Sequence, residues 1–257
     1  MKNNIKVDIN DKYFCYILGL LWGDGYLYNG RVGISMISED LETLIPIFNR
    51  LGNWKMCKSK RNNYKEQLTL RVSDKDFYKF LTNMDYNVKS KKSPTKILSI
   101  INNDNHKYFL RGLFDADGCF YLNKNTRQCI ITSNYEQDWS FISDYYSIRG
   151  WKHSIGRQIS KTGSRSFIRI TNKNILEFGE YIYEDYFGLD RKYTKFVEIK
   201  KSYSRDIIRI GNNKKVIYID DIKYNSITDA VNITGINREI IRYRLKSKNY
   251  NYRYDKV

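Results

Sequence analysis

The chain has 257 residues, of which 41% are hydrophobic, enough to bury one large core or about two or three small ones. The sequence contains no apolar run of about 18 residues, so we expect no membrane span, and its first residues lack the apolar stretch of a secretion signal. Lysine and arginine outnumber aspartate and glutamate 45 to 28, which gives a net charge of +17. Because these cations attract phosphates, the surplus favours nucleic acid as the partner over a membrane surface.

The cysteine and histidine content argues against a zinc site and against a disulfide framework. The four cysteines are scattered and form no CxxC pair: Cys15, Cys57, Cys119 and Cys129. They indicate reduced thiols, and with only His106 and His153 a histidine-rich metal site is excluded. We expect a soluble intracellular protein, in a bacterial or phage-infected cytoplasm or in an organelle.

Residues 1–100 predict one unit with the order helix, hairpin, helix, hairpin, helix. The predicted helices and hairpins cover residues 12–24, 26–37, 39–51, 55–72 and 74–84. Asn29-Gly30 is typical of a type I′ hairpin turn, and the second hairpin is expected to turn at residues 61–63. Ser73 is the expected N-cap of the last helix.

Residues 101–201 repeat this pattern, which indicates a duplicated unit of ordinary domain size. The segments Ile17–Gly25 and Leu110–Gly118 are both apolar, carry small residues four apart, and end in Asp-Gly. Arg71–Phe77 is echoed by Arg169–Ile175 in the same order. The second unit should have hairpins near residues 119–133 and 152–170 and helices near residues 135–147 and 172–184.

The pattern changes after residue 201. Residues 202–215, with Gly211-Asn212-Asn213, are interpreted as a linker, and residues 216–257 as a small helical module. A strand over 216–220 precedes a helix capped by Ser226, a turn at Gly235 and a basic helix that carries Arg238 and Arg242. Two short helices around a glycine turn are typical of a helix-turn-helix that binds DNA. The alternative is a helical cap on the preceding unit.

The two helices that end in Asp-Gly carry the predicted chemistry. Their small residues permit close approach: Gly19, Gly23, Gly112 and Ala116. If the helices pack side by side, Asp24 and Asp117 become neighbours, and two crowded carboxylates favour a cation between them. Oxygen ligands without histidine favour Mg²⁺, which activates phosphates and water.

These two segments resemble the paired motifs of the LAGLIDADG homing endonucleases. Leu110–Gly118 departs from the family motif at few positions, whereas Trp22 replaces the first aspartate of the other copy. The resemblance covers roughly residues 12–200 and implies an α+β fold in which two pseudo-symmetric units form a DNA-binding saddle from antiparallel sheets. It implies a monomer that cuts both strands of double-stranded DNA across the minor groove. It also implies a site for Mg²⁺, with Mn²⁺ as a substitute, at four residues: Asp24, Asp117, Gly23 and Ala116.

The resemblance also points to lysines near the scissile phosphates. Lys91, which precedes Ser93-Pro94, matches the place of a family lysine that stabilises charge or tunes the attacking water. In the second unit Arg191 or Lys192 is the counterpart, and Lys192 is the preferred candidate. Asp115 is present in one motif only and is interpreted as a structural residue.

Alternation along the strands predicts one face for the helices and one for the DNA major groove. Arginine pairs with guanine there, and asparagine or glutamine with adenine. The expected groove-facing residues are Tyr28, Arg31, Lys55, Gln67, Thr69 and Arg71 in the first unit and Tyr121, Asn123, Arg127, Arg165 and Arg169 in the second.

Two other functions fit the same fold. One is a maturase, an RNA-binding splicing cofactor, and the other is a DNA-binding regulator with an inactive nuclease core. The presence of both Asp24 and Asp117 argues against an inactive core. A helix-turn-helix favours duplex DNA, because the narrow major groove of A-form RNA does not admit a helix.

Overall fold

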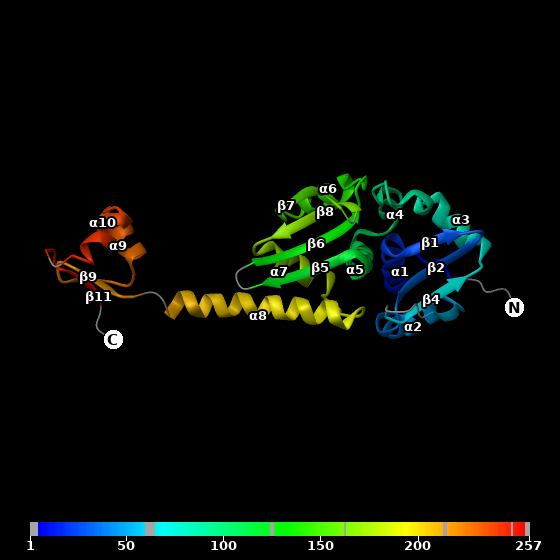
Figure 1. Ribbon diagram of the computed structural model, residues 1–257, viewed down its shortest axis with the longest axis horizontal. Helices are drawn as coiled ribbons and strands as arrows, with labels where there is room; N and C mark the ends of the chain where they lie inside the picture. Colours follow the sequence, from blue (N-terminus) through cyan, green and yellow to red (C-terminus); the bar gives the residue numbers. More distant parts are fainter. Residues whose placement is uncertain are drawn as a thin grey trace. The chain divides into compact units, whose positions relative to one another are not determined.

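The computed structural model describes residues 5–59, 65–123, 126–161, 163–212, 215–247 and 249–254. The chain forms two compact units, Met1–Ile199, here called the core unit, and Lys200–Val257, called the C-terminal unit (Figure 1). The core unit contains two copies of one arrangement, here called the first and second repeats.

The first repeat follows the predicted order of elements. It comprises α1 (Lys12–Gly23), β1 (Gly25–Tyr28), β2 (Arg31–Ile37), α2 (Ser38–Leu51), β3 (Lys55–Ser59), β4 (Gln67–Val72) and α3 (Lys75–Asn83). The strands form an antiparallel sheet in the order β1-β2-β4-β3, against which α2 and α3 pack. Asn29 and Gly30 both have positive φ, as the type I′ turn requires. The predicted turn at residues 61–63 lies outside the described residues.

The second repeat has the same topology, which confirms the duplication and the α+β fold class. It comprises α5 (His106–Asp117), β5 (Gly118–Asn123), β6 (Thr126–Asn134), α6 (Ser140–Ile148), β7 (His153–Ser160), β8 (Gly163–Thr171) and α7 (Asn174–Ile182). Its antiparallel sheet has the order β5-β6-β8-β7. Between the repeats lie η1 (Tyr86–Val88), α4 (Thr95–Ile100) and η2 (Asn103–Asn105).

Three predicted boundaries differ from the structure. The N-cap of α3 is Asp74, not Ser73, because its carboxylate accepts hydrogen bonds from the backbone N–H groups of Asp76 and Phe77. α6 starts at Ser140 rather than near 135, since residues before it form a turn. The predicted linker at 202–215 is helical as far as Asn212, where α8 (Asp190–Asn212) ends. The sequence of α8 contains no proline, and its glycine, Gly211, comes only at the end.

The C-terminal unit contains a sheet that the sequence interpretation missed. Strands β9 (Ile217–Ile219), β10 (Ile222–Tyr224) and β11 (Tyr252–Tyr254) pair in the order β10-β9-β11, beside α9 (Ile227–Thr234) and α10 (Arg238–Arg244). Ser226 caps α9 and Gly235 ends it with positive φ, as predicted. The unit has its own apolar cluster, made of Ile217, Ile219, Tyr224, Ala230, Ile241 and Tyr252. It is therefore a small α+β body and not a purely helical one.

Candidate active site

Helices α1 and α5 pack side by side at the middle of the core unit, with one sheet on each side (Figure 1). A Cβ added to Gly19 would lie 2.8 Å from the backbone nitrogen of Leu113 and closer still to the carbonyl oxygen of Phe109. Gly112 is held in the same way against the backbone of Tyr16 and Leu20. Only glycine fits these two positions, so the small residues act as the sequence predicts.

The close packing brings the two acidic helix ends together. Asp24 is the C-cap of α1, and Asp117 is the last residue of α5. A Cβ on Gly23, the residue before Asp24, would lie 3.1 Å from Oδ2 of Asp117. Ala116, the residue before Asp117, also faces Gly23. The four residues expected at a metal site therefore lie together at one end of the helix pair.

The electrostatics of these carboxylates reflect burial and mutual repulsion. Burial raises the pKa of Asp24, and the positive charges of Lys89 and Lys192 partly offset this rise. Burial and then the charge of Asp24 raise the pKa of Asp117 to about 6. A carboxylate pair of this kind gains from a bound cation, which removes the repulsion.

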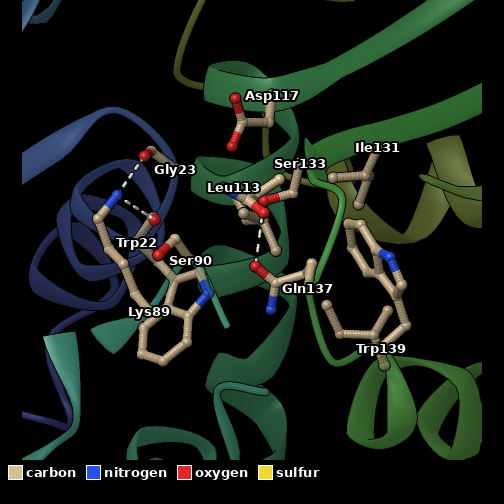
Figure 2. Close-up of a pocket in the computed structure, with 12 residues that line it drawn as sticks. Trp22, Gly23, Lys89, Ser90, Leu113, Asp117, Ile131, Ser133, Gln137 and Trp139 are labelled. Atoms are coloured by element: carbon tan, nitrogen blue, oxygen red, sulfur yellow. Dashed lines mark hydrogen bonds between the residues drawn. The ribbon is translucent and has the colours of Figure 1, made fainter. Parts of the chain in front are cut away.

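Two lysines flank the carboxylates, the half-buried Lys89 in the first repeat and the buried Lys192 in the second. The ammonium group of Lys89 donates to the carbonyl oxygens of Trp22, at 2.6 Å, and Gly23, and Figure 2 shows it between them. The ammonium group of Lys192 donates to the carbonyl oxygen of Gly118. Burial lowers the pKa of both lysines. Each repeat thus places one ammonium group at the end of an Asp-Gly helix.

Lys91, the lysine predicted for the first repeat, does not lie at this site. Its side chain is 67% exposed and forms an ion pair with Glu136 at 2.9 Å. Lys89 takes the position instead because η1 ends just before it and turns it inward. The buried residues Tyr86 and Leu189 each stand three positions before a site lysine, and this shared spacing identifies Lys89 as the counterpart of Lys192.

Arg191, the other candidate of the second repeat, has a different role. Its guanidinium donates to both carboxylate oxygens of Asp40 in α2, at 2.8 and 2.7 Å. Asp40 is buried, so this is a fixed link between the start of α8 and the first repeat. The sequence interpretation did not anticipate a role for Asp40.

A cavity of about 330 Å³ opens beside Asp117 and Lys89. Figure 2 shows Ser133 and Gln137 on its wall, where the hydroxyl of Ser133 donates to the side-chain oxygen of Gln137 at 3.1 Å. By strand register, Ser133 occupies the place of Met36 in the first repeat. The sequence interpretation missed both Ser133 and Gln137 as residues of this site.

Asp115 and Trp22 occupy the same motif position in different ways. Asp115 is fully buried and accepts hydrogen bonds from the hydroxyls of Tyr16 and Tyr183 and from the backbone of Leu189. Burial raises its pKa to about 6 despite these bonds. Trp22 is buried and meets Tyr86 edge-on at 4.9 Å. Asp115 is therefore an interior residue, as the sequence interpretation has it.

The strand register places most predicted DNA contacts on the sheet faces turned away from the helices. In the first repeat all six share this face: Tyr28, Arg31, Lys55, Gln67, Thr69 and Arg71. In the second repeat Tyr121, Asn123, Arg165 and Arg169 do so. Arg127 does not, because it pairs with Leu122 and shares the face of the buried Cys129. Gln128, opposite Tyr121, lies on the outer face instead.

Comparisons with known proteins agree with this geometry. Residues 104–183 match the family described as LAGLIDADG-like domain. The homing endonuclease I-DmoI in complex with DNA and Ca has a TM-score of 0.51 and 19% identity, covering 74% of this chain and 97% of that chain. I-DmoI in complex with DNA and Mn has a TM-score of 0.50 and 21% identity, and the match covers 68% of this chain and 98% of that chain. The homing endonuclease I-WcaI bound to its DNA recognition sequence has a TM-score of 0.53 and 16% identity, and the match covers 74% of this chain and 88% of that chain.

The core unit therefore has the fold of LAGLIDADG homing endonucleases, and the match to the LAGLIDADG-like domain family falls in its second repeat. No curated protein sequence matches the chain. Within the described parts of the chain, none of the helices has the length and apolar character needed to cross a bilayer.

Proposed function

We propose that this chain is a site-specific DNA endonuclease that cuts both strands of a long duplex with the help of a divalent metal. The observation that carries the proposal is the pair Asp24 and Asp117 at the ends of two helices in backbone contact, with one inward-facing lysine added by each repeat. The solved structures of similar fold, which include DNA complexes with Ca and Mn, support it.

The donor atoms at the pair fit Mg²⁺, with Mn²⁺ as a substitute. Two carboxylates, with the backbone at Gly23 and Ala116 beside them, offer oxygen ligands only. No group of three or more acidic, cysteine or histidine residues that could hold a metal occurs in the parts of the chain described. The pair of carboxylates suits Mg²⁺, because this ion binds one or two carboxylates and completes its shell with phosphate and water. When bound, such an ion polarises a scissile phosphate and lowers the pKa of water.

The remaining roles belong to the chain itself. Asp24 and Asp117 would hold the divalent metal at the pseudo-symmetric centre, and Lys89 and Lys192 place positive charge where phosphate oxygens gain negative charge. The outer faces of the two sheets read the major groove, through residues such as Arg71 and Arg169. Because both carboxylates come from one chain, a monomer suffices.

The C-terminal unit is proposed to contact DNA next to the core site. Its apolar cluster belongs to the unit itself, which favours a separate module over a cap. On α10, Arg238 and Arg242 are exposed beside the exposed Ile240 and Tyr243. A tethered module adds affinity through effective concentration.

The decisive experiment is incubation of the protein with a randomised duplex library and Mg²⁺, followed by sequencing of the cut ends. We expect one long preferred target, cleavage with Mn²⁺ as well, binding with little turnover in Ca²⁺, and no cleavage in excess EDTA. Asp24→Asn serves as the control that binds but does not cut. Specific binding without cleavage by the unaltered protein would favour a DNA-binding regulator, and preference for structured RNA would favour a maturase.

A further inference from the structure

Asp115 joins three elements of the core unit at one buried carboxylate. Its Oδ2 accepts from the hydroxyl of Tyr16 in α1 at 2.8 Å and from the backbone N–H of Leu189 at 3.0 Å. Its Oδ1 accepts from the hydroxyl of Tyr183, which follows α7, at 2.8 Å. The side chain has no exposed surface. A buried carboxylate with three donors is fixed in place, because the loss of any one leaves a polar group unsatisfied.

The bond to Leu189 leads directly to the site lysine. The carbonyl oxygen of Leu189 accepts from the backbone N–H groups of Lys192 and Tyr193, at 2.9 and 3.2 Å, and so starts α8. Gly188 has φ +134°, and a Cβ there would lie 2.5 Å from Oδ2 of Asp115, so the chain passes the carboxylate closely. The Lys192 ammonium then reaches the carbonyl of Gly118.

These contacts form a closed path from Asp115 through Leu189 and Lys192 back to Gly118, three residues along the chain from Asp115. Asp117, the proposed metal ligand, lies between the two ends of this path. We infer that Asp115 is a positioning residue that sets the place of the Lys192 ammonium relative to Asp117. The effect of Asp115 on catalysis rests on the proposed function, whereas its effect on the position of the Lys192 ammonium group does not.

The first repeat achieves the same placement without a carboxylate. Trp22 stands at the motif position of Asp115 and packs on Tyr86, whose hydroxyl donates to the carbonyl oxygen of Leu18 at 2.8 Å. Tyr86 opens η1, which ends just before Lys89. Lys89 therefore does not depend on Asp115, and it serves as the internal reference for Lys192.

The first test needs no DNA. The whole protein, as the unaltered chain and as Asp115→Asn, is treated briefly with acetic anhydride, and the acetylation of Lys192 and Lys89 is measured by mass spectrometry. Asparagine keeps the shape but has one acceptor oxygen, so its amide N–H group meets either the hydroxyl of Tyr183 or the donors of Tyr16 and Leu189, and the anchor at the start of α8 is weakened. We expect the ratio of Lys192 to Lys89 labelling to rise roughly 10-fold, the scale of one lost buried hydrogen bond. Gly188→Ala, which keeps Asp115 but crowds its contact with Leu189, should raise the ratio in the same direction.

The second test measures cleavage of each strand of a duplex labelled at either end. Asp115→Asn should slow one strand roughly 10-fold more than the other, and it should add nothing to Lys192→Met on that strand, because both variants act through one group. An unchanged labelling ratio in both variants, or equal slowing of both strands with an additive double variant, would overturn the inference. If the unaltered protein cuts no duplex, the proposed function fails and the labelling ratio alone decides the role of Asp115.

Discussion

Asp117→Asn should make the metal-free protein more stable while it abolishes cleavage. The folded-state pKa of Asp117 is raised from 3.8 to about 6, by burial first and the charge of Asp24 second. At about 1.4 kcal/mol per tenfold change in acidity, this corresponds to about 3 kcal/mol. The side chain is half-buried, so solvent screening reduces the expected gain to about 1–2 kcal/mol.

The pH dependence follows from the direction of this shift. A raised folded-state pKa means that the charged carboxylate disfavours the folded protein, and the penalty is fully present above pH 6. As the pH falls from 6 towards 4, the folded protein binds the proton first and the penalty disappears. The stability advantage of Asp117→Asn should therefore be full at pH 7 and small near pH 4.

The assay is urea unfolding of the metal-free protein at pH 7 and pH 4. Asp144→Asn, which changes an exposed aspartate of α6, is the matched control and should leave the midpoint unchanged at both values. Cleavage and binding of the target are measured in parallel with Mg²⁺. An Asp117→Asn protein that is less stable than the unaltered chain at pH 7 would show that the charged carboxylate does not destabilise the fold. One that still cuts both strands would show that the carboxylate is not required for cleavage.

Three further variants test other parts of the site. Gly112→Ala should lower the free energy of unfolding by about 2–3 kcal/mol, because the added methyl group meets the backbone of α1. It should also slow cleavage about 100-fold by displacing the carboxylates. An unchanged unfolding midpoint and an unchanged cleavage rate would contradict the close packing. Lys89→Met should slow cleavage about 100-fold, whereas Lys91→Met, at an exposed ion pair, should leave it within about twofold; the reverse order in a single-turnover assay would restore Lys91. Arg238→Ala combined with Arg242→Ala should weaken binding and reduce the salt dependence by about two units of slope; an unchanged slope in binding titrations would remove these arginines from the DNA interface.

The sequence predicted the fold because two kinds of local constraint agree with each other. The Asn29-Gly30 turn and the alternation along each strand fix the sheets, and the repeated Asp-Gly helices fix the duplication. Gly19 and Gly112 predict the backbone contact that brings Asp24 and Asp117 together. These features depend on spacing along the chain, which is visible without a structure.

The lysines and the cavity could not be read from the sequence in the same way. Lys89 and Lys91 differ by two positions in a lysine-rich segment, and only the direction of η1 decides which one points inward. The cavity is lined by residues from several elements, among them Ser133, whose place opposite the helices follows only from the strand register. Arg127 lies on the inner face for the same reason, since its place follows from its pairing with Leu122.

The two repeats have the same backbone fold, but different side chains surround their carboxylates. In the second repeat, Arg191 links α8 to Asp40 by three hydrogen bonds, and the buried Asp115 anchors the start of α8 near Lys192. In the first repeat, an aromatic contact supports Lys89, which lines a cavity of polar and apolar side chains beside Asp117. The backbone contact at the glycines holds both acidic ends in one place, although the residues that support the two ends differ between the repeats. Trp22 and Asp115 therefore occupy one motif position with different contacts, an aromatic pair in the first repeat and a set of hydrogen bonds in the second.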